Sequence, residues 1–193
     1  MSSRTNLTRE DWIHAAQEVL VTSGVDAVRV DTLAKELKIT RGSFYYHFKS
    51  RSELLEGILG NWRARATEDV ILHLRNAHSS PLQQLQRLLE LPSHGQTAKD
   101  AASIELGIRG WARRDKQARQ AIDEVDSHRL SYIEGLLIQA GVPDSEAQDR
   151  AYLIYAYQIS LSLLHSEDTP QQRLERSQRM AGILIPEAGS TAA

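Results

Sequence analysis

The chain contains no cysteine and lacks the features of secreted and membrane proteins. Without cysteine it can form neither a disulfide nor a thiolate metal site. No apolar run approaches the roughly 20 residues that a membrane span requires. The first ten residues, MSSRTNLTRE, lack the apolar stretch of a signal peptide. We therefore expect a cytoplasmic protein that does not contact a membrane.

Patterns typical of catalysis are also missing. The sequence has no glycine-rich phosphate loop and no strand–turn–helix nucleophile site. Its seven histidines follow no spacing expected of metal ligands or of a catalytic triad. His73 and His78, for example, are five apart, which puts them on different faces of a helix. We expect no enzyme activity, no metal and no cofactor.

What the sequence does contain is helical periodicity along almost its whole length, without strand signals or repeats. Thr8 can cap a first helix, with Asp11 completing an acidic capping box, and Gly24 ends that helix. Ser50 and Glu53 predict another capping box, for a helix that runs to about residue 73. The other predicted helices cover about 31–37, 41–48, 81–91, 97 onward with a break around Gly107 and Gly110, 116–140, 145–165 and 169–185, before a disordered tail at 187–193. This is an all-α protein of about nine helices.

Positive charge is concentrated in one segment, although the formal net charge is −2. Residues 27 to 52 hold six basic side chains and two acidic ones. Such a local excess is typical of a nucleic-acid contact.

The same segment contains the aromatic run TRGSFYYHFKSR, residues 40 to 51. With Thr40 as N-cap, a helix would place Phe44 and Phe48 on one side, where they can pack with Leu33, Leu37 and Leu54. The opposite side and the flanks carry Gly42, Ser43, Tyr45, Tyr46 and His47. A short helix over 31–37, a turn and this helix predict a helix-turn-helix unit, which places its second helix in the DNA major groove.

Residues 30–59, VDTLAKELKITRGSFYYHFKSRSELLEGIL, resemble the tetracycline-repressor (TetR) family of bacterial transcription regulators. With the preceding helix the resemblance covers roughly residues 8 to 56. It implies a three-helix DNA-binding head at 1–56 and a helical body at 57–193 that binds a small molecule and forms a homodimer through its last two helices. It also places DNA-contacting residues at Thr40, Arg41, Gly42, Ser43, Tyr45, Tyr46, His47 and Lys49. We add Arg29, Lys38 and Arg51 to this set because of their charge.

Two positions depart from the family pattern. Arg29 stands where a threonine or serine commonly caps the second helix, so we look to Asp31 for the cap. Lys38 replaces the usual turn glycine. A left-handed conformation there would cost a lysine on the order of 1 kcal/mol. Of the predicted contacts, Tyr46 has the alternative of lying on its neighbours.

The C-terminal body offers a dimer surface and a pocket. Residues 151–164, AYLIYAYQISLSLL, are apolar or small all round, so this helix is expected to be buried on more than one side. A stripe on the last helix, Leu174, Ser177, Ala181 and Leu184, would complete a dimer interface; the alternative is a core helix of a monomer. Candidate pocket residues are Trp62, Trp111, Tyr132, Tyr155 and Gln158, each with plain core as its alternative.

The resulting prediction is a homodimeric regulator that binds a palindromic operator on double-stranded DNA. We expect a repressor that a small-molecule effector releases. The alternatives are a ligand-responsive activator and a helical adaptor that does not bind DNA. The residues identify neither the effector nor the operator.

Overall fold

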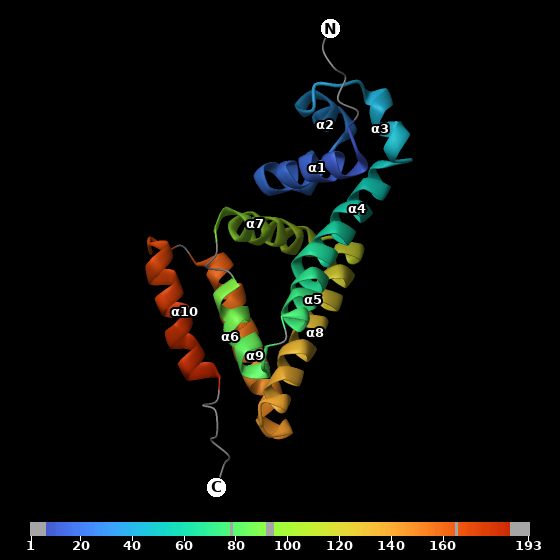
Figure 1. Cartoon of the computed structure of the whole chain (residues 1–193). Coiled ribbons are helices and arrows are strands. Elements are labelled where there is room, and N and C mark those ends of the chain that lie inside the picture. The colour runs from blue at the N-terminus through green and yellow to red at the C-terminus, as the bar shows by residue number, and fades with distance from the viewer. Residues whose placement is uncertain (1–6, 78, 92–94, 165, 186–193) are drawn as a thin grey trace. The chain divides into compact units, whose positions relative to one another are not determined.

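The structure is a computed structural model that describes residues 7–77, 79–91, 95–164 and 166–185. The predicted tail at 187–193 lies outside the described residues. Within them the secondary structure is entirely helical, as predicted (Figure 1). The elements are α1 (Arg9–Ser23), the 3-10 turn η1 (Val25–Ala27), α2 (Val30–Glu36), α3 (Arg41–His47), α4 (Arg51–Arg63), the π-helical turn η2 (Ala64–Glu68), α5 (Asp69–Asn76), α6 (Pro81–Glu90), α7 (Gly95–Ala112), α8 (Lys116–Gln139), α9 (Asp144–Leu163) and α10 (Pro170–Leu184). None of these helices is long and apolar enough to cross a membrane.

The predicted start of α1 is confirmed in atomic detail. The Thr8 amide donates to Asp11 Oδ2 at 2.7 Å, and the Asp11 amide donates to Thr8 Oγ1 at 3.2 Å. The hydrogen bonds from the Thr8 amide and hydroxyl hold the pKa of Asp11 below its usual range. Gly24 ends α1 with a φ of 78°, in the region that glycine tolerates best.

The single helix predicted from residue 51 to about 73 is wrong. The π-helical turn η2 divides it into α4 and α5, so the described residues form ten α-helices where about nine were predicted. The local sequence does not predict this turn, because residues 64–68 are ARATE, without proline or glycine.

The predicted break around Gly107 and Gly110 is also wrong, since α7 runs without interruption to Ala112. Gly107 serves packing and not a turn. A Cβ at this position would lie 3.2 Å from Leu20 Cγ and 3.6 Å from the Leu20 carbonyl oxygen. The missing side chain therefore lets α7 approach α1 closely.

The chain forms two compact units, which we call the N-terminal unit (1–65 and 104–122) and the C-terminal unit (66–103 and 123–193). The chain passes from one to the other within η2, within α7 and within α8. These units are packing units. The functional division at residue 56 stays a prediction.

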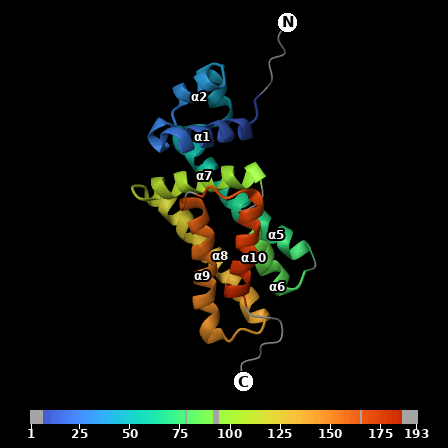
Figure 2. The ribbon, with the colours of Figure 1, turned by 90° about the vertical axis from the view of Figure 1, so that its left-hand side faces the viewer.

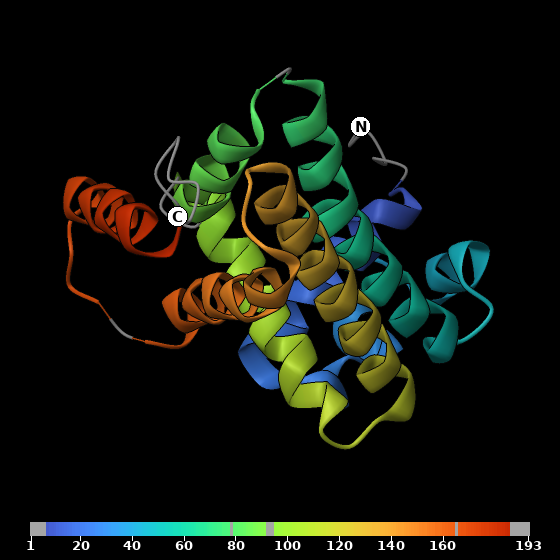
Figure 3. The same cartoon turned by 90° about the horizontal axis from the view of Figure 1, so that it is seen from below.

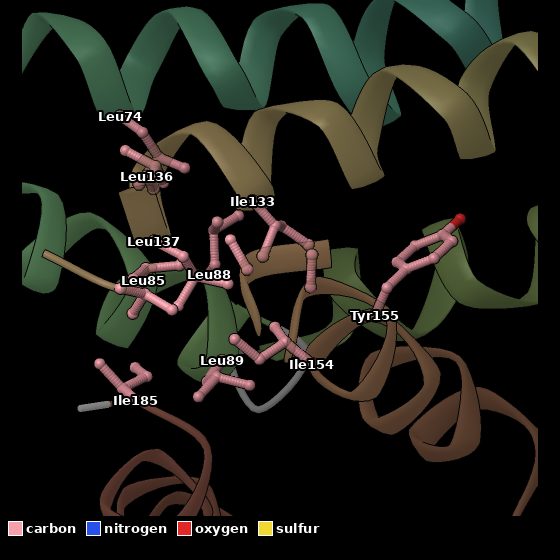
Figure 4. Close-up of a cluster of buried hydrophobic side chains, with 13 residues drawn as sticks. Leu74, Leu85, Leu88, Leu89, Ile133, Leu136, Leu137, Ile154, Tyr155 and Ile185 are labelled. Carbon is pink, nitrogen blue, oxygen red and sulfur yellow. The ribbon is translucent and has the colours of Figure 1, made fainter. Parts of the chain in front are cut away.

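A continuous apolar core fills the C-terminal unit. Leucines of α6, Leu85 and Leu89, meet Leu137 of α8 and Ile154 of α9, all of them fully buried (Figure 4). The last helix, α10, packs mainly along α6 and also touches α9. Figure 3 shows α10 at the margin of this unit.

Candidate nucleic-acid interface

The N-terminal unit builds a platform for the short helix α3. Helix α1 packs against α2 and α4, and α2 packs against α3. In Figure 1, α2 and α3 lie together on the same side of α1. The ring of Trp12 in α1 meets the ring of Phe44 in α3 edge-on, with centroids 5.3 Å apart. Helix α3 is therefore fixed to both of the preceding helices.

The inner side of α3 is anchored as predicted. Phe44 and Phe48 are 0% and 1% exposed, and their rings stack with centroids 5.4 Å apart. Leu33 and Leu54 are fully buried beside this pair, and Leu37 is half-buried. Burying a phenylalanine contributes roughly 1.5–3 kcal/mol, so two of them suffice to hold a seven-residue helix in place.

The outer side of α3 presents the predicted DNA-contacting side chains to solvent. Tyr46 is 87% exposed and Tyr45 is 57% exposed. The Tyr46 ring leans only on His47, at a centroid distance of 5.3 Å. Thr40, Arg41, Gly42 and Lys49 are exposed as well, and Ser43 and His47 are half-buried. Exposed tyrosine hydroxyls next to basic side chains can hydrogen-bond the phosphates that line a DNA groove. The contacts themselves stay a prediction.

The turn between α2 and α3 contains the left-handed lysine that the sequence suggested. Lys38 has a φ of 54°, and its amide donates to the Lys35 carbonyl at 3.2 Å. The Ile39 amide donates to the Ala34 carbonyl at 2.9 Å. These two bonds form a Schellman motif with lysine in the position that usually holds glycine. The Lys38 side chain is exposed.

The predicted cap of α2 is wrong, and that of α3 is right in position only. Asp31 does not cap α2. Its carboxylate pairs with the Arg41 guanidinium at 2.8 Å, and α2 has no side-chain cap. Thr40 occupies the N-cap position of α3 but makes no side-chain cap bond. The Arg41 partner of Asp31 comes from the next helix, so the local sequence does not predict this pair.

The helix α4 begins with a variant of the predicted box. Ser50 Oγ accepts from the Glu53 amide at 3.2 Å, as expected. The Glu53 carboxylate, however, accepts from the Lys49 amide at 2.7 Å and not from that of Ser50. The main-chain amide of Lys49 is thereby fixed, while its side chain stays exposed.

Two of the arginines added for their charge have bonds within the protein. Arg51 donates from Nε to the Val28 carbonyl and from Nη2 to the Val25 carbonyl, both at 2.6 Å. Arg29 donates from Nε to the Asp26 carbonyl at 2.9 Å. Arg51 thus joins the start of α4 to the segment before α2. A DNA role for Arg51 would have to coexist with these two bonds.

The five predicted pocket residues are divided between the two units. Four of them are either buried in the apolar core or hydrogen-bonded within their own unit. Trp62 and Trp111 are buried in the N-terminal unit. In the C-terminal unit, Tyr132 donates to Gln84 Oε1 at 2.6 Å, and Gln158 donates to the Leu88 carbonyl at 2.9 Å. Burial raises the pKa of Tyr132, and Arg75 opposes this shift. Their effector role stays a prediction.

The fifth residue, Tyr155, takes part in a polar network that the sequence did not reveal. Tyr155 donates to Asp126 Oδ1 at 2.6 Å and accepts from Arg129 Nη1 at 3.1 Å. Arg129 Nε donates in turn to Thr67 Oγ1 at 3.1 Å. Thr67 lies 62 residues from Arg129, so no spacing rule could have connected them. In the described part of the chain, no group of three His, Asp or Glu side chains could hold a metal ion.

Two short helices joined by a four-residue turn and anchored on α1 define a helix-turn-helix protein. Residues 13–58 match the family model described as bacterial regulatory proteins, tetR family. This N-terminal segment of the chain therefore matches the TetR family.

Several curated relatives match over part of the chain. The chain is 39% identical over 54 residues to the HTH-type transcriptional regulator SrpR of Pseudomonas putida, which covers 28% of this chain and 25% of SrpR. It is 30% identical over 80 residues to the HTH-type transcriptional repressor BepR of Brucella suis biovar 1 (strain 1330), which covers 42% of this chain and 38% of BepR. The match thus spans less than half the length of either relative.

The whole fold resembles solved transcriptional regulators. FadR from Bacillus subtilis, solved in complex with stearoyl-CoA, superposes with a TM-score of 0.70 over 96% of this chain and 100% of that chain. The identity is 18%, so this likeness concerns the fold.

Proposed function

We propose that the protein is a homodimeric transcriptional repressor that binds a palindromic operator and leaves it when a small molecule binds. The outer side of α3 is the observation that carries this proposal. It combines an 87% exposed Tyr46 with exposed basic residues on a helix whose other side is fully buried. In the proposed complex, α3 enters the major groove of each half-site.

The predicted stripe on α10 does not supply the dimer surface, because Ser177 is 1% exposed and Ala181 and Leu184 pack against the apolar core of the same chain. Other apolar side chains on the last two helices are exposed and support the dimer. Leu153 on α9 and Ile183 on α10 are 56% and 71% exposed, and Leu164 directly after α9 is 70% exposed. In Figure 2, α9 and α10 stand side by side at the front of the C-terminal unit. Joining two copies through these helices would bury this surface. It would also give two recognition helices, about 34 Å apart if they read successive turns of DNA.

The effector is supported by fold alone. FadR of Bacillus subtilis shares the fold and was solved with stearoyl-CoA. The C-terminal unit of this chain contains a half-buried polar network among apolar helices, which is the setting that small-molecule sites use. An effector must bind the DNA-incompetent arrangement more tightly than the competent one.

Selection of bound sequences from a random DNA pool tests the proposal. We expect an enriched palindrome whose half-site centres are spaced by about one helical turn or a modest extension of it. Affinity for this palindrome should fall steeply with salt, because each neutralised phosphate releases counterions. If DNA affinity is absent, or does not change with salt concentration, the result would favour the helical adaptor that does not bind DNA. Expression of a reporter gene behind the palindrome then distinguishes repressor from activator.

A further inference from the structure

The π-helical turn η2 stands out because nothing in its own sequence requires it. The residues ARATE are ordinary helix formers, without proline or glycine. A π turn has poorer geometry than an α turn, and single π turns are frequent at functional sites. The turn must therefore be held by contacts from outside it.

One such contact is made by Thr67. Its side chain is 3% exposed, and its hydroxyl accepts from Arg129 Nε at 3.1 Å. Arg129 also donates to the Tyr155 hydroxyl, which donates to Asp126. We call these four residues the Thr67 network. All four belong to the C-terminal unit, and they come from η2, α8 and α9.

A π turn and an α turn are two discrete states. Converting η2 from π-helix to α-helix would shorten its main-chain hydrogen-bonded turn by one residue. The helix after it would then rotate by about 100° and shift by about 1.5 Å relative to the helix before it. Intermediate positions break main-chain hydrogen bonds, so the turn adopts one register or the other. The passage from the N-terminal to the C-terminal unit, between Arg65 and Ala66, lies within η2.

We propose that η2 is a register switch, which the Thr67 network holds in its π form. Breaking the bond between Arg129 and Thr67 lets the turn relax to α-helix and changes the position of α4 relative to α5. In the proposed repressor, we assign DNA binding to the π form of η2. The inference rests on that proposed function for its effect on DNA, but not for the switch itself.

The substitution Thr67→Val tests the switch, because it keeps the branched shape and removes the acceptor. Thr67→Ser, which keeps the hydroxyl, should behave like the wild type. Gln84→Met is the matched control, since it removes part-buried side-chain hydrogen bonds, to Tyr132 and to the Ser79 carbonyl, elsewhere in the same unit. Arg129→Gln approaches the same bond from its donor side, in case Thr67→Val folds poorly.

Two readouts on the full-length protein are needed. Hydrogen exchange should slow several-fold at residues 68–72 in Thr67→Val, because an α turn protects amides better than a π turn. Affinity for the selected palindrome should fall at least tenfold, while affinity for a duplex with one half-site changes less than twofold. Gln84→Met should show neither effect.

Faster exchange at 68–72, or unchanged affinity for the palindrome, would overturn the switch. A wild-type protein without sequence-specific binding would overturn the proposed function instead. In that case the exchange measurement still decides whether η2 changes register.

Discussion

At the scale of single residues, Lys38 is the clearest conflict between sequence and conformation. It adopts a φ of 54°, the only positive φ among the described residues other than glycine. The end of α8 repeats the same motif with a glycine. There the Gly141 amide donates to Ile138, the Val142 amide donates to Leu137, and Gly141 has a φ of 93°. One chain thus contains a strained and an unstrained copy of one turn.

We expect Lys38→Gly to stabilise the protein by about 0.5–1 kcal/mol, because the relief of left-handed strain exceeds the entropy that glycine adds to the unfolded chain. Urea denaturation at fixed protein concentration measures this. The same change should weaken operator binding and lower its salt slope by about one, through loss of a phosphate contact. Unchanged affinity would remove Lys38 from the interface.

Gly141→Lys is the reciprocal control. A Cβ at Gly141 would meet no atom within 4 Å, so the substitution adds strain without a clash. It should destabilise the protein by about 1 kcal/mol and leave operator affinity unchanged. Loss of DNA binding in this variant would show that the effect of Lys38→Gly is not local.

Residue-level predictions succeeded where the partner is near in sequence. The Thr8–Asp11 box, the end at Gly24 and the conformation of Lys38 are each set within a few residues, and each was predictable. The partner of Asp31 is Arg41, on the next helix, and the acceptors of Arg51 lie 23 and 26 residues away. Local rules carry no information on such pairs.

At the scale of elements, the two sides of α3 have different roles. The inner side anchors the helix, and the outer side carries the predicted DNA contacts. The inner phenylalanines hold the helix, whereas Tyr45 and Tyr46 on its outer side are mostly exposed, so changes to the outer face should alter binding far more than the fold. We expect Tyr45→Ala with Lys49→Ala to abolish operator binding and leave the dimer and its stability within about 0.5 kcal/mol of wild type. Fluorescence anisotropy with the labelled operator measures the first effect, and sedimentation the second.

Lys35→Ala is the control for lost charge, because Lys35 is exposed on α2 and outside the predicted contact set. It should weaken binding far less than the double substitution. Dissociation of the dimer in the double variant would mean that the DNA-contacting face has been misplaced.

Element boundaries were predictable where capping residues mark them and not where packing overrides them. The start of α10 at Thr169 and Pro170 follows from the cap and the proline. At η2, Thr67 bonds to Arg129, and in α7, Gly107 packs against Leu20; both partners are distant in sequence. The outward position of Tyr45 and Tyr46 was predictable because helical spacing alone fixes it once Phe44 and Phe48 are buried.

At the scale of the whole molecule, the predicted dimer rests on apolar side chains that the chain leaves exposed. We expect Ile183→Glu to give a monomer and to weaken operator binding at least tenfold, because a charge in a buried interface lacks a partner. Sedimentation at several concentrations measures the first effect. Leu72→Glu is the control, since Leu72 is 57% exposed on α5, outside the proposed interface. A dimer that persists in Ile183→Glu would move the interface elsewhere.

The composition of the compact units could not be predicted from the sequence. Residues 104–122 join the N-terminal unit through Gly107 against Leu20 and through a hydrogen bond of 3.3 Å from Gln117 to Glu56. These partners are 61 or more residues away in the chain. The all-helical fold class could be predicted, because helical periodicity in the sequence is sufficient to indicate it.

The two bonds of Arg51 have a consequence for how the head tolerates mutation. Their acceptors are the main-chain carbonyls of Val25 and Val28, which every amino acid supplies. Substituting either valine side chain therefore leaves the acceptor in place, whereas a change at residue 51 removes both bonds at once. The two bonds that join α4 to the loop before α2 therefore depend on the side chain of residue 51 alone.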